Sequence, residues 1–290
     1  MVLKPVIALL FLEILPIAVL YILISVFRLK KKSKRSPLTR DLLRSPGQSL
    51  RDKLDEINDS ITEYIVAMFI VPIVVFAYFI TQPSLSQRAY YLFIIIIACY
   101  GYFLYKLWPL LKDRNNHTLG LECEMAVGQE LNNLMLDGYR VYHDFPAEKF
   151  NIDHIVVGPK GVFAIETKGR AKKAKKGGGA AVTVHYDGTA LNFPGWSERQ
   201  PVEQAKAQAD WLAQWLSSAV GERVLVRPVL AIPGWYLVKE SHDNLLLFNG
   251  KNPGPLLNAL DGSLSPQLIN RIAHQLEQRC RDIEPTSYSK

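Results

Sequence analysis

The sequence predicts an α/β domain, in which a mixed β-sheet is flanked by helices, preceded by three transmembrane helices. Two observations lead to this fold class. Nearly all of the very apolar sequence of the 290-residue chain lies before Leu111, and residues 112–290 are mixed in polarity. In that second part the patterns run helix, strands, helix, strand, strand, helix, an order typical of a sheet covered by helices. The chain therefore divides into a membrane region, residues 1–111, and a soluble domain, residues 112–290.

Three stretches of the membrane region approach the roughly 20 apolar residues that cross a bilayer: residues 6–27, 65–80 and 89–108. The second is short and contains Pro72, so a buried core helix is its alternative. The first contains Glu13, which we interpret as a carboxylate facing a neighbouring helix rather than as a membrane-embedded functional site.

A basic run, Arg28–Arg35, follows the first stretch with six basic residues and no acidic one. Positively charged loops stay in the cytoplasm, so the loop 28–63 and the soluble domain are expected inside an inner or plasma membrane, with the amino terminus outside. A cleaved signal peptide is disfavoured because a small-residue cleavage site is missing. The run can also contact anionic lipid, although a role as topology signal is enough to explain it.

The soluble domain opens with a helix over residues 121–140, ended by Gly138. Further helices are expected at 201–221, with Pro201 in the first turn, and at 265–280. The strands are expected at residues 141–145, 152–157, 162–167, 224–232 and 245–248, with a second hairpin over 181–195 that turns at Asp187-Gly188. Pro228 fits an edge or bulge position of its strand better than a central one. The three cysteines are far apart and indicate neither a disulfide nor a zinc site: Cys99, Cys123 and Cys280.

The strands at 152–157 and 162–167 form a probable hairpin around the turn GPKG. Residues two apart on a strand share a face, so Glu166 and Lys168 project together. If Gly158 faces Gly161, Asp153 lies opposite Glu166. The proline of the turn cannot take a positive φ, and a type I turn with a bulge would shift this pairing by one residue.

Two carboxylates held close together repel one another, and a mostly apolar sheet is a costly place for them. A divalent cation resolves both costs, and Mg²⁺, with Mn²⁺ as a possible substitute, is commonly bound by one or two carboxylates. Lys168 beside the metal could orient or deprotonate a water, or stabilise charge that develops on phosphorus. The alternative is that Asp153, Glu166 and Lys168 form a surface ion-pair ladder.

Two further polar residues lie on apolar helix faces. Glu130 is at helical spacing from Val127 and Leu134, so it is expected to point to the sheet. Gln204 is in register with Gln208 and two tryptophans, and it is interpreted either as a site residue or as the ordinary polar end of an amphipathic helix. His154 would point to the face opposite Asp153 and is expected to be a packed or hydrogen-bonded histidine.

Three pieces of sequence, in this order, resemble the nuclease-related domain (NERD) family, a branch of the PD-(D/E)XK nuclease superfamily with a restriction-endonuclease-like fold. They are GQE at residues 128–130, IDHIVVGPKGVFAIETK at 152–168 and PVEQ at 201–204. The resemblance implies that Asp153 and Glu166 bind the metal, that Lys168 is the catalytic lysine, that Glu130 completes the metal site and that Gln204 supports it. One departure is Gly169, where the family often has asparagine.

A basic segment follows this motif and contains no acidic residue; its cations are Arg170, Lys172, Lys173, Lys175 and Lys176. A cationic loop beside a metal centre would bind nucleic-acid phosphates in a salt-dependent way, and a solvated charge run is the alternative. The sequence thus predicts a membrane-anchored, Mg²⁺-dependent nuclease that hydrolyses phosphodiester bonds, in DNA rather than RNA. The rival hypotheses are a non-catalytic nucleic-acid-binding module and a protein-interaction scaffold.

Overall fold

The structure is a computed structural model that describes residues 18–26, 35–80, 85–172, 182–258 and 264–286. It divides into two compact units. The first comprises residues 1–40, 54–115 and 284–290, and the second comprises residues 41–53 and 116–283. Residues 41–53, which the sequence assigned to a cytoplasmic loop, thus belong to the second unit.

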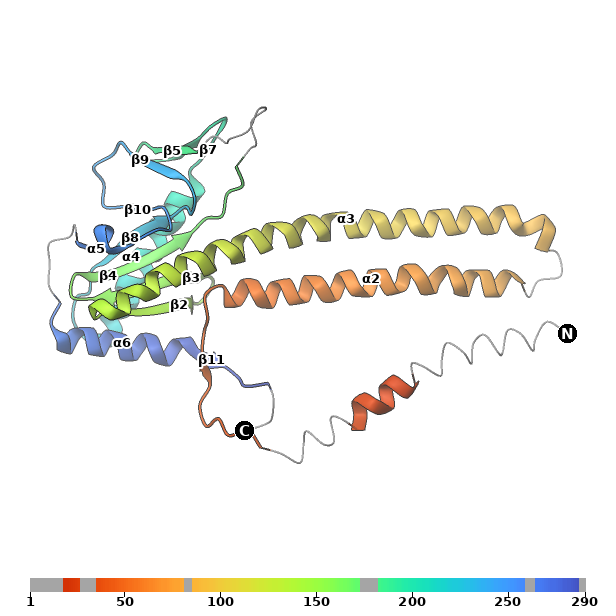
Figure 1. Cartoon of the computed structure of the whole chain (residues 1–290), viewed down its shortest axis with the longest axis horizontal. Helices are drawn as coiled ribbons and strands as arrows, with labels where there is room; N and C mark the ends of the chain where they lie inside the picture. The colour runs from red at the N-terminus through yellow and green to blue at the C-terminus, as the bar shows by residue number, and fades with distance from the viewer. Residues whose placement is uncertain (1–17, 27–34, 81–84, 173–181, 259–263, 287–290) are drawn as a thin grey trace. The chain divides into compact units, whose positions relative to one another are not determined.

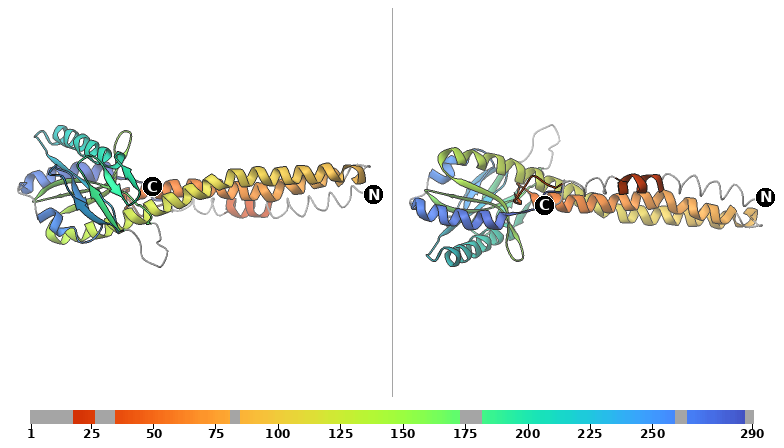
Figure 2. Two further views of the ribbon diagram at one scale, coloured as in Figure 1. Left: turned by 90° about the horizontal axis from the view of Figure 1, so that it is seen from above. Right: turned by 90° about the horizontal axis from the view of Figure 1, so that it is seen from below.

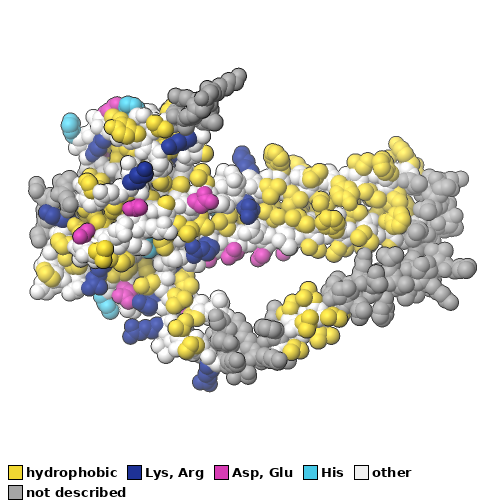
Figure 3. Space-filling model, viewed as in Figure 1, with side chains coloured by type: hydrophobic (Ala, Val, Ile, Leu, Met, Phe, Trp, Pro, Cys, Tyr) yellow, Lys and Arg dark blue, Asp and Glu magenta, His cyan; other side chains and the backbone are white. Residues whose placement is uncertain are grey.

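Two long helices dominate the first unit and also contribute to the second: α2 (Gln48–Ile80) and α3 (Leu85–Asn132) (Figure 1). Both are longer than the expected spans at 65–80 and 89–108, and both are long and apolar enough to cross a membrane. In the most apolar 18-residue stretch of each helix, only 6% and 11% of the stretch is buried, respectively. Figure 3 shows apolar side chains along both helices. Such exposure is typical of a lipid-facing surface, because a water-soluble unit would cover these side chains.

The first expected span, residues 6–27, lies mostly outside the described residues. Of that stretch the structure describes residues 18–26 as helical. The described residues therefore contain two candidate membrane-spanning helices.

The second unit is a mixed α/β domain, as the sequence predicts. Its strands are β1 (Leu42–Leu43), β2 (Arg140–Pro146), β3 (Asn151–Gly158), β4 (Gly161–Thr167), β5 (Thr183–Tyr186), β6 (Leu191–Phe193), β7 (Trp196–Glu198), β8 (Val226–Ala231), β9 (Tyr236–Lys239), β10 (Leu246–Phe248) and β11 (Arg281–Ile283). Its other helices are a 3-10 helix (Asn133–Asp137), α4 (Gln200–Val220), α5 (Gly254–Asn258) and α6 (Pro266–Cys280). The central sheet has the order β10-β8-β4-β3-β2; β10, β8 and β4 are parallel, and β3 and β2 are antiparallel to their neighbours. A second sheet has the order β7-β6-β5-β9, and β1 pairs with β11.

Helices cover both faces of the central sheet. One face packs against α4 and α6 through a core that includes Ile155, Ala164, Leu212 and Ile272. The other face packs against the end of α3, whose Val127 belongs to the opposite core. Figure 2 shows α4 and the end of α3 on opposite sides of the sheet. The sheet is therefore buried on both sides, which explains why its strands read as nearly continuous apolar runs.

The β3–β4 hairpin has the register expected from the sequence. Gly158 pairs with Gly161 and His154 pairs with Ile165, so each pair of residue numbers has the same sum. Gly161 has a φ of +131°, a conformation that suits glycine. The shift by one residue that the proline in the turn made possible does not occur. Continuing this register by one step brings Asp153 level with Glu166.

The placement of Pro228 differs from the expected edge or bulge. Its strand, β8, lies inside the sheet between β4 and β10, and Pro228 pairs with Ala164 of β4. The pairs between β8 and β10 begin only at Val229. Pro228 thus lies just before the β10 ladder, where β8 is locally an edge, and its missing N–H does not remove a hydrogen bond to β10.

Candidate active site

The end of the β3–β4 hairpin brings together the three residues that the sequence singled out. Lys168 Nζ lies 2.5 Å from Glu166 Oε1. The backbone N–H of Thr167 donates a hydrogen bond of 2.6 Å to Asp153 Oδ2. Glu166 is buried, with 2% of its surface exposed, whereas Asp153 and Lys168 are half-buried. Two carboxylates and one ammonium group therefore share a site that is open on one side.

A local irregularity of the neighbouring strand pair lies beside Asp153. The pairing of β2 with β3 runs from His143 opposite His154 to Phe145 opposite Ile152. Asp144, between them on β2, has a φ of 48°. The register is the same on both sides of Asp144, so the irregularity is a one-residue distortion of β2 and not a bulge. A positive φ is uncommon outside glycine, and residues held in such conformations cluster at functional sites.

The electrostatics of the site show a third carboxylate, that of Glu124 on α3. Glu124 is 8% exposed. Burial raises its pKa to about 8, the negative charges of Asp144 and Glu166 add to this rise, and Lys168 opposes it. Burial also raises the pKa of Asp153 well above its ordinary value; the charges of Glu166 and Glu124 act in the same direction, against the Thr167 hydrogen bond and Lys168. The three carboxylates thus sense one another's charge, and a bound cation would relieve their repulsion.

The helix carboxylate at the site is therefore Glu124, and the expectation for Glu130 is corrected. Glu130 is half-exposed, and among the described residues no hydrogen bond or ion pair joins it to Asp153, Glu166 or Lys168. Both glutamates fit the helical period. At about 100° per residue, however, Glu124 lies about 40° and Glu130 about 80° from the midline between Val127 and Leu131. This difference is the sequence signal that could have identified Glu124.

The glutamine at the site is Gln208, one helical turn beyond the expected Gln204. Gln208 is 3% exposed, and its Nε2 donates 2.7 Å to Glu166 Oε2 and 3.2 Å to the carbonyl oxygen of Asn151. Gln204 instead accepts a 3.3 Å hydrogen bond from Gln200 near the surface. Both glutamines lie on the same face of α4, and only the deeper one reaches the sheet.

The two described cations of the basic segment are engaged within the domain. Arg170 forms an ion pair with Glu198, with Nη2 at 2.6 Å from Oε2. Lys172 donates to the carbonyl oxygen of Gly234 and lies 5.6 Å from the centre of the Trp235 ring. Both therefore help to attach the segment after β4, and their expected contact with nucleic-acid phosphates stays a prediction. The remaining expected cations, Lys173, Lys175 and Lys176, lie outside the described residues.

His154 is a packed and hydrogen-bonded residue, as expected. It is fully buried, and its Nδ1 lies 2.9 Å from Nδ1 of His143, whose Nε2 contacts Asn132 at 3.0 Å. Burial lowers the pKa of His143 to about 4 and that of His154 well below its ordinary value. The pair is therefore neutral at physiological pH, so one imidazole donates and the other accepts.

The geometry of the site limits which metal could bind. Within the part of the chain that the structure describes, no three side chains of histidine, cysteine, aspartate or glutamate form a ready-made metal cage. A metal that needs only one or two carboxylates and fills its shell with water places fewer demands on the protein. The oxygen donors of Asp153 and Glu166 fit such a hard cation better than a thiolate- or imidazole-binding metal.

Comparison with known proteins identifies the domain. Residues 119–233 match the family model of the nuclease-related domain, NERD. The matched region includes α3 from residue 119, the β3–β4 hairpin and α4. No curated protein matched the chain, and neither did any solved structure. The matched region contains Glu124, Asp153, Glu166, Lys168 and Gln208. Residues 119–233 thus form a nuclease-related (NERD) domain, which follows two apolar helices that could span a membrane.

Proposed function

We propose that this chain is a membrane-anchored, metal-dependent nuclease that hydrolyses phosphodiester bonds in nucleic acid, with DNA as its main substrate. The observation that carries the proposal is the meeting of Asp153, Glu166, Lys168 and Glu124 at one end of a hairpin in a nuclease-related domain. Perturbed carboxylates beside a lysine are frequent at catalytic sites.

The carboxylates supply the donors for Mg²⁺ or Mn²⁺. Asp153 and Glu166 would bind the ion directly, and Glu124 would add a third negative charge from α3. An ion held by these residues would supply Lewis-acid chemistry, since it would polarise the phosphodiester and lower the pKa of a water. Gln208 holds one oxygen of Glu166, and the other oxygen contacts Lys168.

We assign Lys168 a direct role in the reaction. Its ammonium group lies beside Glu166, and 19% of the side chain is exposed, so it would be able to contact a substrate phosphate next to the carboxylates. A lysine in this place would orient the attacking water or stabilise the negative charge that develops on the phosphoryl oxygens.

The exposed apolar surfaces of α2 and α3 support the membrane anchor. We assign the nuclease-related domain to the cytoplasmic side of an inner or plasma membrane, since the basic run at 28–35 precedes it and positive charge is retained inside. The same run would attract anionic lipid headgroups.

One observation favours a second candidate, a non-catalytic nucleic-acid-binding domain. The 2.5 Å ion pair between Lys168 and Glu166 neutralises the buried carboxylate with the protein's own cation. A domain that uses this pair only for stability would bind nucleic acid in a salt-dependent manner without cutting it.

A cleavage assay separates the two functions. The full chain in detergent is incubated with single-stranded DNA, duplex DNA or RNA, in Mg²⁺ or in EDTA. We expect Mg²⁺-dependent cleavage that falls at least about 100-fold in Asp153→Asn and in Lys168→Ala. Glu130→Gln is the matched control, a carboxylate on the same helix as Glu124 that lies outside the cluster, and it should keep wild-type activity. Equal rates for wild type and Asp153→Asn on all three substrates would refute the catalytic proposal, and binding without cutting would support the second candidate.

A further inference from the structure

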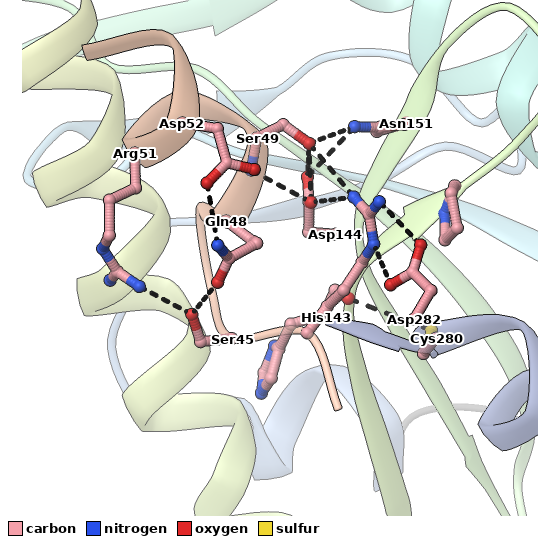
Figure 4. A network of polar contacts seen from close by, with 12 residues as sticks. Ser45, Gln48, Ser49, Arg51, Asp52, His143, Asp144, Asn151, Cys280 and Asp282 are labelled. Carbon is pink, nitrogen blue, oxygen red and sulfur yellow. Dashed lines mark hydrogen bonds and ion pairs between the residues drawn. The ribbon is translucent and has the colours of Figure 1, made fainter. Parts of the chain in front are cut away.

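A buried carboxylate outside the candidate active site ties the start of α2 to the central sheet. Asp144 of β2 is 3% exposed. It accepts hydrogen bonds from Ser49 Oγ at 2.6 Å and from the backbone N–H of Ser49 at 3.1 Å, and it forms an ion pair with Arg44 at 2.7 Å (Figure 4). Ser49 lies in the first turn of α2, so Asp144 also caps a helix amino terminus, where a negative charge is stabilising. Arg44 in turn binds Asp282 of β11 at 2.8 Å.

The same network continues towards the site through Asn151, the first residue of β3. Its side-chain amide donates to Ser49 Oγ and, at 3.3 Å, to Asp144 Oδ1. Its carbonyl oxygen accepts from Gln208 Nε2, the atom that also donates to Glu166. Hydrogen bonds on the two sides of Asn151, to its side-chain amide and to its backbone carbonyl, therefore link Ser49 in the first turn of α2 to a candidate metal-binding carboxylate.

The segment also packs directly against α3 beside Glu124. A Cβ atom added to Gly128 of α3 would lie 2.7 Å from Pro46, so glycine is needed there for the segment to approach. Gly47 has a φ of +68°, and a Cβ at that position would lie 2.4 Å from Leu121 and 3.5 Å from Glu124 Oε2. The segment thus approaches the candidate active site by two independent routes, one polar and one through packing.

We propose that Ser49 and Arg44 are positioning residues of the candidate active site, which act on Glu166 through Asp144, Asn151 and Gln208. The inference rests on the proposed function, because Glu166 is there a metal ligand. Residues 41–53, which include the first residues of α2, then form part of the nuclease unit, although they lie outside the matched region 119–233.

Ser49 is expected to affect the site because its hydroxyl group forms hydrogen bonds with both Asp144 and Asn151. Without the Ser49 hydroxyl, Asp144 would retain its ion pair with Arg44 but would lose the contacts that this hydroxyl makes with both of its carboxylate oxygens. Asn151 would lose one hydrogen-bond acceptor. A buried carboxylate draws remaining donors towards it, because an unsatisfied charge is costly in a low-dielectric site. The amide of Asn151 belongs to its side chain and the carbonyl that holds Gln208 to its backbone, so a shift of the Asn151 backbone towards Asp144 would move that carbonyl, and Glu166 would lose a fixed orientation.

The test is the affinity of the full chain for Mn²⁺, measured in detergent by electron paramagnetic resonance without nucleic acid. Ser49→Ala is expected to weaken Mn²⁺ binding by up to about 10-fold, the low end of the 10- to 100-fold loss that follows removal of a direct partner of a metal ligand, because Ser49 acts through Asn151 and Gln208. Ser49→Thr keeps the hydroxyl and should restore wild-type affinity. Ser45→Ala is the matched control, since Ser45 lies in the same segment and bonds Gln48 and Arg51 rather than Asp144. Ser49→Ala with wild-type affinity would overturn the inference.

Two further measurements keep the inference falsifiable. If Ser49→Ala does not fold, Arg44→Lys, which keeps the charge, should still weaken Mn²⁺ binding, and unchanged affinity would overturn the proposal. If the wild type binds no Mn²⁺, the proposed metal-dependent function fails. In that case the link between Ser49 and Gln208 through Asn151 is tested by comparing the thermal-midpoint shifts of Ser49→Ala, Gln208→Ala and the double variant. Additive shifts would show that the two residues are independent and would overturn the link, whereas non-additive shifts would support it.

Discussion

Replacement of Glu124 by glutamine should make the protein more stable at alkaline pH. The pKa of Glu124 rises from 4.5 in the unfolded chain to about 8 in the folded protein, because of burial and then of the nearby charges of Asp144 and Glu166. Between these two pH values the unfolded chain has released a proton that the folded protein retains. The contribution of Glu124 is therefore most favourable below pH 4.5 and is lost progressively as the pH rises towards 8. Glutamine, which does not titrate, removes this loss.

The size of the effect follows from the shift. Each pH unit inside the window changes the free energy of unfolding by about 1.4 kcal/mol, so the difference between wild type and Glu124→Gln should grow by about 4 kcal/mol from pH 5 to pH 8. For a domain of this size, 4 kcal/mol corresponds to a thermal-midpoint difference of about 8 to 16 °C.

Thermal unfolding of the full chain in detergent, with EDTA and at pH 5 and pH 8, measures this difference. Glu130→Gln is the control for replacing a glutamate of the same helix by glutamine, since Glu130 is half-exposed and lies outside the cluster. Saturating Mg²⁺ should reduce the advantage of Glu124→Gln at pH 8, because the cation offsets the repulsion. A pH-independent gap between wild type and Glu124→Gln would show that Glu124 does not lie in the charged cluster.

Denaturant unfolding tests three other predictions. Gln208→Ala should lower the free energy of unfolding by about 1–3 kcal/mol, because Glu166 loses a donor, whereas Gln204→Ala should change it by less than about 0.5 kcal/mol; equal effects would contradict the assignment. Burial lowers the pKa of His143 to about 4. As the pH falls from 6.5 to 4, the free energy of unfolding of the wild type should therefore fall by up to about 3 kcal/mol relative to His143→Gln. A difference that does not change with pH would disprove a neutral buried imidazole. Gly158→Ala should be destabilised by about 1–3 kcal/mol, because the new Cβ would lie 2.0 Å from the Tyr139 ring, and wild-type stability would show that the ring can move aside.

The local parts of this fold could be predicted from the sequence because local chemistry determines them. The hairpin of β3 and β4 needs only two apolar runs and a turn that ends in glycine, and its register follows once Gly158 faces Gly161. The boundaries of α4 follow in the same way from Pro201 and Gly221, which has a positive φ of 77°.

The parts that could not be predicted depend on tertiary contacts. The angular position of Glu124 on α3 favours it over Glu130, but both fall within the apolar stripe, and the rotation of the helix against the sheet decides between them. Gln204 and Gln208 share one face of α4, and only the depth of the helix end selects Gln208. The role of residues 41–53 leaves no periodic signal, because it depends on Asp144, which is about a hundred residues further along the chain.

The central claim, that Asp153 and Glu166 hold the metal of a nuclease, is tested most directly by locating a bound ion. Crystals of the full chain soaked with Mn²⁺, measured at the manganese absorption edge, would place the ion from its anomalous signal. The proposed site predicts one peak in contact with oxygens of Asp153 and Glu166, close to Glu124, which disappears in Asp153→Asn crystals soaked in the same way. A peak elsewhere on the domain, with none between these two carboxylates at saturating Mn²⁺, would contradict the assignment of the site.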